Sequence, residues 1–485
     1  MSFSSVSFYV FMFAVFFIYW GIPHKFRYIL VATANLIFYL SFGVKFLPVL
    51  IAEIIIAYFG ARVLEKKRDK VLFALIIVLT LIPLITFKYV DFAIYTFDKV
   101  LSVLGAPLSD NTLKLVAPIG ISFYTFELIS YITDVYKGKI TAEKNIIRVF
   151  VFAGFFANIT SGPIERAGVF LPGIDEEKRF NYEEATFGLK LVMLGLVKKI
   201  CGANVLKQYV DNVFGNIYAY KGPVFIIAIV LYTYEIYLDF SGYTDMARGF
   251  AKMLGFSLSE NFLRPYLSCG IKEFFARWHV SLSQWLRDYV YIPLGGSRCK
   301  KMRKYVNLMI TFFVSGLWHG ASFTFIVWGL LHGVYQCVAD LIKPLIGKVR
   351  GFVRGSGSGR ALRAVRIFVT FLLVSFAWMF FRANSLSDAK YIMMNMFIGD
   401  NFYGQLLQMG FLSVLSIVFT VLIIGLTIVY DVYSERLSAK GSDVITEFGR
   451  LPLVFRYVLY VAIGVMIIVL RAHVGAGAEF IYLKF

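Results

Sequence analysis

Charged residues are scarce in this chain. They make up 16% of its 485 residues, whereas soluble domains carry about 25%. Hydrophobic residues reach 59%, and the mean hydropathy is +0.72. Apolar runs that approach the roughly 20 residues needed to cross a bilayer recur along the chain. The composition therefore excludes an ordinary soluble protein and predicts an all-α, multi-pass membrane protein.

Cysteine is also scarce. Cys201, Cys269, Cys299 and Cys337 are widely separated, and their spacing matches neither a metal site nor a disulfide framework. We therefore expect no bound metal. In a soluble protein the formal net charge of +19 would indicate nucleic acid as a partner. In a membrane protein Lys and Arg instead collect in cytoplasmic loops beside anionic lipid, so we expect the lipid bilayer as a partner and no nucleic acid.

The N-terminus lacks the features of a signal peptide, namely a positive first region and a small-residue cleavage site. Its first positive charges, Lys25 and Arg27, follow the first apolar run. The positive-inside rule then predicts an N-terminus outside the cytoplasm. The same rule places three basic segments, 65–70, 297–304 and 341–366, in the cytoplasm.

The apolar runs predict how the chain meets the bilayer. They lie near 5–22, 28–42, 46–63, 71–88, 114–133, 146–160, 184–197, 223–240, 306–319, 322–341, 367–382, 410–430 and 453–470. Some are too short to cross alone and are expected to be re-entrant or interfacial. We predict roughly ten to twelve crossings. The chain has no visible pair of matching halves, which many secondary transporters have.

Ionisable residues inside apolar spans are costly and face a cavity or a partner. Glu235 and Asp239 lie four residues apart and would share one face of a helix, with Asp245 close behind. Paired carboxylates are suited to acid–base chemistry or to cation binding. Alternatively, they form a buried structural network with Arg248 or Arg287.

The apolar stretch 310–336 contains histidines and regularly spaced glycines. His319 and His332 are thirteen residues apart and would point to nearly opposite faces of one continuous helix, so they are not expected to form one site. A neutral imidazole is a good general base at neutral pH. The small-xxx-small spacing lets neighbouring helices approach closely; it is seen at Gly316 and Gly320 and at Gly329 and Gly333.

Residues 274–304 form a polar and aromatic block. Its first part has the pattern of an amphipathic helix, which we expect to end at Pro293 and the glycine pair that follows. Glu273 precedes Arg277 by four residues, a favourable orientation for an ion pair. On a continuous helix Trp278 and Trp285 would share one face, and His279 and Ser283 another. The block predicts an interfacial helix, which serves either as part of a site or only as an anchor.

Several stretches together resemble the membrane-bound O-acyltransferase family, and in particular its bacterial alginate O-acetyltransferase branch. They are APIGISFYTFELISYITDVYKG (117–138), GPIERAG (162–168), YEIYLDFSGYTDMARG (234–249), ENFLRPYLSCGIKEFFARWHVSLSQWLRDYVYIPLGGSR (260–298), SGLWHGASFTFIVWGLLHG (315–333), FAWMFFRANSL (376–386) and EFIYLKF (479–485). The resemblance runs from about residue 5 to the end, and block 260–333 is the most specific. Glu127 and Glu235 depart from it, because the family more often has Gln there.

The resemblance implies a helical bundle around a central tunnel, formed by a single acyltransferase domain over residues 1–485. We divide it into N-terminal spans (1–110), a catalytic core (111–340), a basic flexible cytoplasmic loop (341–366) and C-terminal spans (367–485). The histidine of LWHG, His319, corresponds to the family's catalytic residue, and that of RWH, His279, to its second tunnel histidine. The residues expected to support them or to bind substrate are Trp278, Asn261, Trp318, Ser315, Arg287, Asp288, Asp239 and Glu235.

The resemblance also implies a reaction. His319 would act as general base on an acceptor hydroxyl, with Trp278, Asn261 or a protonated His279 stabilising the oxyanion, or it would carry the acyl group itself. No cofactor is expected to stay bound. The donor would be acetyl-CoA, or alternatively the phosphopantetheine thioester of an acyl carrier protein.

The expected location is the cytoplasmic membrane of a bacterium. An extracytoplasmic acetyltransferase and a polysaccharide acceptor would be the partners. Three alternatives stay open: D-alanyl transfer to teichoic acid, a transporter or channel with a histidine and carboxylate proton relay, and a scaffold without catalysis.

Overall fold

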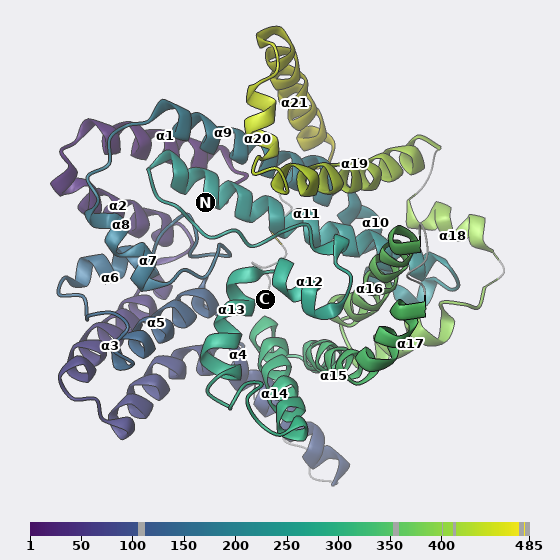
Figure 1. Ribbon diagram of the computed structural model, residues 1–485, viewed down its shortest axis with the longest axis horizontal. Coiled ribbons are helices and arrows are strands. Elements are labelled where there is room, and N and C mark those ends of the chain that lie inside the picture. Colours follow the sequence, from purple (N-terminus) through teal and green to yellow (C-terminus); the bar gives the residue numbers. More distant parts are fainter. Residues whose placement is uncertain (105–111, 353–357, 400, 411–413, 475–479, 481–485) are drawn as a thin grey trace. The chain divides into compact units, whose positions relative to one another are not determined.

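The computed structural model describes residues 1–104, 112–352, 358–399, 401–410, 414–474 and 480. Helices make up the regular structure of these residues, in keeping with the predicted all-α fold (Figure 1). The chain divides into two compact units. The first contains residues 1–192 and 246–259, and the second contains residues 193–245 and 260–481.

The first unit is built from the N-terminal helices. They are α1 (Val6–Gly21), α2 (His24–Leu40), η1 (Val44–Phe46), α3 (Leu47–Lys66), α4 (Lys70–Val103), α5 (Ile121–Tyr136), α6 (Ile146–Ala153), α7 (Ala167–Phe170), α8 (Pro172–Asp175) and most of α9 (Tyr182–Leu196). Helix α5 is buried along most of its length and packs against α3 and α4. Its N-cap is Gly120, whose φ of 74° and close approach to the Ile159 carbonyl leave no room for a side chain.

The second unit contains the polar block and the two family histidines. Its first elements are η2 (Val197–Ala203), α10 (Asn204–Gly215), η3 (Ile217–Ala219), α11 (Val224–Met253), η4 (Pro265–Leu267), α12 (Ile271–Arg277), α13 (Val280–Leu286) and η5 (Arg287–Tyr291). They are followed by α14 (Lys301–His319), α15 (Phe323–Phe352), α16 (Ser358–Arg382), α17 (Leu386–Asn395), α18 (Phe402–Met409), α19 (Val414–Ser438), α20 (Val444–Gly449) and α21 (Leu453–Val474). The last residues of α11 belong to the first unit.

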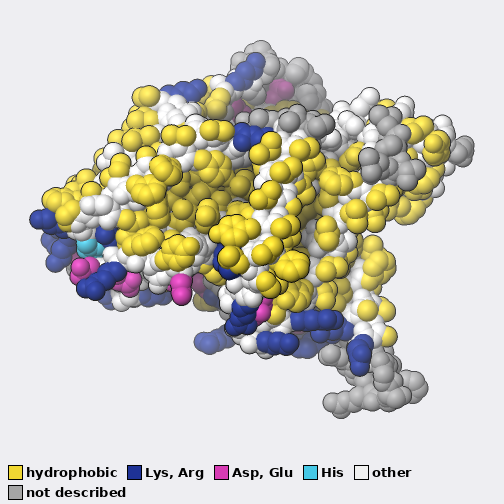
Figure 2. Space-filling model, turned by 90° about the horizontal axis from the view of Figure 1, so that it is seen from above, with side chains coloured by type: hydrophobic (Ala, Val, Ile, Leu, Met, Phe, Trp, Pro, Cys, Tyr) yellow, Lys and Arg dark blue, Asp and Glu magenta, His cyan; other side chains and the backbone are white. Residues whose placement is uncertain are grey.

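Seven helical segments of the described residues are long and apolar enough to cross a membrane. They are Val44–Lys66, Lys70–Val103, Val224–Met253, Phe323–Pro344, Gly359–Arg382, Ser416–Ser438 and Leu453–Arg471. The last is apolar on all sides and buries none of its residues, as expected for a helix that faces lipid. Figure 2 shows broad apolar areas on the molecular surface. The multi-pass membrane class is therefore confirmed, whereas ten to twelve crossings stays a prediction.

The basic segment 341–366 is more helical than predicted. Helix α15 continues to Phe352, and α16 starts at Ser358. The Gly/Ser centre of the segment lies at 353–357, outside the described residues, as does most of the tail motif 479–485. The division of the chain into one domain with four parts stays a prediction.

Candidate active site

His279 lies at a break between two short helices. Helix α12 ends at Arg277, Trp278 is extended, and His279 has left-handed backbone angles (φ 44°, ψ 56°) before α13 begins at Val280. The prediction of one continuous helix through this block is therefore wrong, and so are the shared faces derived from it. The Glu273–Arg277 ion pair is present, at 2.9 Å. A left-handed non-glycine residue costs of order 1–3 kcal/mol and persists only where its surroundings hold it.

A second segment, 261–264, satisfies the backbone groups at this break. Phe262 and Trp278 form an isolated antiparallel bridge. The Leu263 amide donates to the Arg277 carbonyl (2.9 Å), and the Val280 amide donates to the Asn261 carbonyl (3.1 Å). These bonds replace those that a continuous helix would have made, because buried backbone groups need partners. The break at His279 is thus a built feature of the fold.

His319 is positioned by close helix packing. It is the last residue of α14, which runs beside α15 in a tight hairpin (Figure 1). A Cβ added to Gly316 would lie 2.4 Å from the Phe325 carbonyl oxygen, and one added to Gly329 would lie 2.2 Å from that of Phe312. Only glycine fits at such distances, so the close approach predicted from the glycine spacing is confirmed.

The structure brings the two family histidines to one aromatic side chain. The Trp318 ring centroid lies 5.7 Å from that of His279 and 5.0 Å from that of His319. Phe240 contacts His279 at 4.8 Å, while Trp328 and Phe381 contact His319 at 4.9 and 5.2 Å. The two histidine residues are only 2% and 3% exposed. Both imidazoles therefore sit in an apolar, aromatic environment.

Burial sets the charge of His279. It lowers the pKa of this imidazole from 6.5 to about 3, because a buried cation loses its hydration. At neutral pH the ring is therefore neutral. This pKa direction disfavours a protonated His279 as the oxyanion donor, although a neutral imidazole still carries one N–H donor.

Asn261 offers a further donor beside His279. Its side chain is 1% exposed, and its Oδ1 accepts a hydrogen bond from the Ser281 amide at 3.0 Å. Within the part of the chain that the structure describes, its Nδ2 has no hydrogen-bond partner. A buried amide N–H without a partner is costly, which is a reason to expect a ligand atom there. Asn261 thus fits the predicted role of an oxyanion donor.

The other predicted site residues differ in how deeply they are buried. Trp278 is buried against Phe274 and Trp378, with ring centroids 5.5 and 4.9 Å away. Ser315 is buried one helical turn before His319. By contrast, Arg287 is exposed and pairs with its neighbour Asp288 at 2.8 Å. The pair lies in η5, where Arg287 is exposed and Asp288 is half-buried, whereas both histidines are buried.

Two of the three carboxylates on α11, Asp239 and Asp245 but not Glu235, form ion pairs with lysines that the sequence analysis did not consider. Asp239 pairs with Lys199, and Asp245 pairs with Lys198 at 2.6 Å. Both lysines lie in η2, a π-helical turn, and Lys199 and Asp239 are almost fully buried. These contacts support a structural network, but its basic members are lysines rather than the expected arginines. The sequence held one sign of these ion pairs: two adjacent lysines, Lys198 and Lys199, directly follow an apolar run and need acidic partners if they are buried.

His332 is closer to the site than predicted. His319 ends α14 and His332 lies in α15, so the two are not on one helix. The Trp328 ring contacts both of them, each at 4.9 Å between centroids. His332 is fully buried among aromatic rings. The argument that separated the two histidines by helix face is therefore wrong.

The buried histidines and the membrane-type helices belong to a chain that is similar to membrane-bound acyltransferases. The membrane-bound O-acyltransferase family pattern matches residues 142–380. The chain is 34% identical to the "Probable alginate O-acetylase AlgI" of Azotobacter vinelandii, over 88% of this chain and 85% of the relative. The "Peptidoglycan O-acetyltransferase" of Helicobacter pylori is 31% identical (75% and 72% covered), and the "Teichoic acid D-alanyltransferase" of Bacillus subtilis is 29% identical (55% and 69% covered).

The chain belongs to the membrane-bound O-acyltransferase family, and the resemblance noted in its motifs is confirmed. It is accordingly an enzyme, an O-acyltransferase of the multi-pass membrane type.

Proposed function

We propose that this enzyme transfers an acetyl group from a cytoplasmic thioester across the membrane for O-acetylation of an extracellular polysaccharide. The observation that carries the proposal is the buried pair of histidines that both contact Trp318, in a chain of this family. The alginate and peptidoglycan relatives favour acetyl as the acyl group. Acetyl-CoA is the proposed donor, and no cofactor stays bound.

His319 is the proposed general base. It takes the proton of the acceptor hydroxyl, and the oxygen attacks the thioester carbonyl carbon. The resulting oxyanion accepts a hydrogen bond from Asn261 Nδ2, which has no partner among the described residues. The C–S bond then breaks, and the protonated His319 returns its proton to the departing thiolate. His279, neutral at pH 7 and also in contact with Trp318, orients the thioester.

The direction of transfer follows from the proposed topology. We propose that the start of α14, with its lysines, and the start of α16, with its arginines, lie in the cytoplasm of a bacterial cell and that the N-terminus of the chain lies outside, which the positive-inside rule supports. Donor thioester would enter from the basic side. The acetyl group would leave on the other side to an extracytoplasmic acetyltransferase or directly to the polysaccharide.

A test uses the full chain in liposomes with radiolabelled acetyl-CoA and an oligosaccharide acceptor, and measures thiol release and acceptor labelling. His319→Ala should lower turnover by about 10²–10⁴-fold, as for loss of a general base. His279→Ala should leave measurable residual turnover. His24→Ala is the matched control, because His24 lies in the first unit, and it should stay near wild type.

Two results would contradict the proposal. Equal and complete loss in His319→Ala and His279→Ala would refute the division of roles. Ion or sugar flux that persists in His319→Ala, without any thioester turnover, would favour a transporter.

A second candidate is D-alanyl transfer, which the Bacillus subtilis relative favours. The acyl donor distinguishes D-alanyl transfer from acetyl transfer. If the enzyme transfers D-alanine, it will turn over a carrier protein loaded with D-alanine but not acetyl-CoA.

A further inference from the structure

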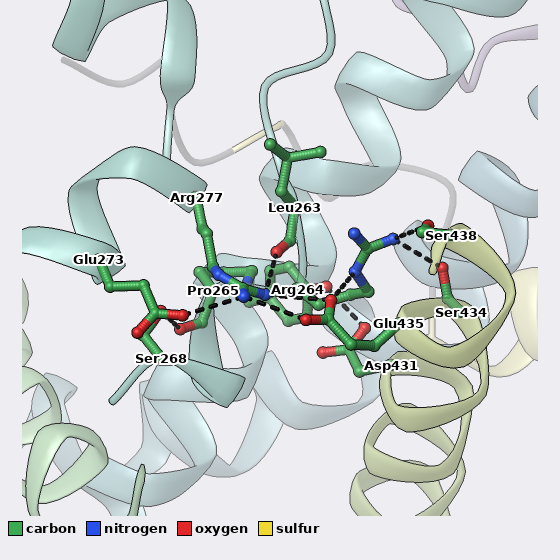
Figure 3. A network of polar contacts seen from close by, with 11 residues as sticks. Leu263, Arg264, Pro265, Ser268, Glu273, Arg277, Asp431, Ser434, Glu435 and Ser438 are labelled. Carbon is green, nitrogen blue, oxygen red and sulfur yellow. Dashed lines mark hydrogen bonds and ion pairs between the residues drawn. The ribbon is translucent and has the colours of Figure 1, made fainter. Parts of the chain in front are cut away.

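Two arginines and one glutamate form a compact polar cluster near the His279 break (Figure 3). Glu435 of α19 lies between Arg277 and Arg264. Its Oε1 and Oε2 accept from Arg277 Nη2 and Nη1 at 3.0 and 3.1 Å, and its Oε2 pairs with Arg264 Nε at 2.8 Å. A carboxylate held by two nitrogens of one guanidinium is the strong, geometrically specific kind of ion pair. We call Arg264, Arg277 and Glu435 the clamp.

The clamp holds both segments that form the break. Arg264 ends the segment 261–264 in a left-handed conformation (φ 51°), and Arg277 is the last residue of α12. The backbone of Arg277 accepts from the Leu263 amide at 2.9 Å, and its Nη1 donates to the Leu263 carbonyl at 3.3 Å. His279 is only two residues from Arg277. Whatever fixes these arginines therefore fixes the backbone that presents the imidazole.

Helix α19 contributes further polar contacts at the same end. Ser434 and Ser438 accept hydrogen bonds from Arg264 Nη1 at 3.1 and 2.8 Å. Asp431, one turn before Glu435, accepts from the hydroxyl of Tyr237 on α11 at 2.8 Å. The clamp residues are partly shielded from water, with side chains 16% to 27% exposed. Ion pairs of this kind have more effect on geometry than fully exposed pairs.

We propose that Glu435 is a positioning residue: through the clamp it holds the 261–264 and 277–281 segments together and so fixes the orientation of His279. The left-handed backbone at His279 needs such support, because strained conformations persist only where neighbouring contacts determine them. The proposal rests on the proposed function only in taking His279 as a residue that faces the thioester. The position of His279 itself can be measured without any reaction.

The experiment compares Glu435→Gln, Glu435→Asp and wild type as full-length protein in detergent. Modification of each histidine by diethyl pyrocarbonate is followed by mass spectrometry, and kcat and KM for acetyl-CoA are measured alongside. Glu435→Gln keeps the shape but loses the charge, so we expect His279 to be modified at least 5-fold faster. His332, fully buried in the same unit, should stay protected. We expect kcat to fall about 10-fold, with KM changed less than 2-fold.

Two further variants serve as controls. Glu435→Asp keeps the charge and should retain most of the protection of His279. Glu447→Gln removes another glutamate–arginine pair, between Glu447 of α20 and the exposed Arg450 that follows this helix, and should behave as wild type. If Glu435→Gln cannot be purified, Arg264→Gln removes the other arm of the clamp and should give the same selective exposure of His279.

Unchanged protection of His279 and unchanged kcat in Glu435→Gln would overturn the proposal. So would equal exposure of His279 and His332, because that would mean general loosening rather than positioning. Absence of thioester turnover in wild type would instead count against the proposed function, while selective exposure of His279 would still support the clamp.

Discussion

The two histidines that contact Trp318 are held by different kinds of structure. His319 ends a helix whose glycines pack directly against the backbone of α15. His279 lies at a break in the helix, held by backbone pairing with 261–264 and by the clamp. The first arrangement depends on shape, and the second depends on hydrogen bonds and charge. The difference predicts that the two positions respond to different perturbations.

The largest effect is expected from filling the space between α14 and α15. In Gly329→Ala the new methyl would lie 2.2 Å from the Phe312 carbonyl oxygen, so the helices must separate. We expect a loss of about 1–3 kcal/mol, the usual range for overpacking, together with most of the turnover. Thermal unfolding of the solubilised protein and acetyl transfer would measure both.

Gly425→Ala is the matched control, because nothing lies within 4 Å of a Cβ added there on helix α19. It should leave activity unchanged and stability unchanged or slightly raised, since alanine is the better helix former. Equal behaviour of the two variants would show that close packing does not position His319.

A smaller effect is expected from acid, and it should act on the His279 side. The folded pKa of His279 is about 3 against 6.5 for a free imidazole, so below pH 6.5 the unfolded chain takes up a proton that the folded chain does not. The stability contributed by this group is therefore present above pH 6.5 and is lost as the pH falls toward 3. In His279→Asn, whose side chain tolerates left-handed angles, this part of the acid sensitivity should disappear.

The measurement is the difference in Tm between wild type and His279→Asn from pH 7 to pH 4.5. Wild type should lose stability relative to the variant over this range. A constant difference would mean that His279 is hydrated in the folded protein, contrary to its burial.

The contrast also explains what the sequence could predict. The hairpin around His319 follows from local spacing, because glycines four residues apart and an apolar run specify a close helix pair. The position of His279 does not, because the break at 278–279 depends on pairing with a segment more than ten residues away and on a glutamate in α19. Helical periodicity alone favoured a continuous helix there, and the long-range contacts determined the outcome.

The carboxylates show the same limit. Helical spacing correctly placed Glu235 and Asp239 on one helix, α11. The ionic partners of Asp239 and Asp245 could not be read from α11, because Lys199 and Lys198 come from a different part of the chain. Motif resemblance supplied the family and the histidines, but partners that are distant in sequence required the three-dimensional structure.

The smallest effect is expected from salt, and it should separate the two histidines most finely. The clamp borders an open hollow of about 510 Å³, so dissolved ions can reach it. Raising the ionic strength from 0.15 M to 1 M shortens the Debye length from about 8 to about 3 Å and weakens exposed charge pairs. Modification of His279 by diethyl pyrocarbonate, normalised to free N-acetylhistidine, should then rise modestly, less than in Glu435→Gln. The end of the α14–α15 hairpin beside His319 is held by glycine packing, and the Lys304–Asp340 ion pair of the same hairpin lies about four turns away along α14, so modification of His319 should stay constant. A parallel rise at both histidines would mean that one shared structure, rather than two, holds them.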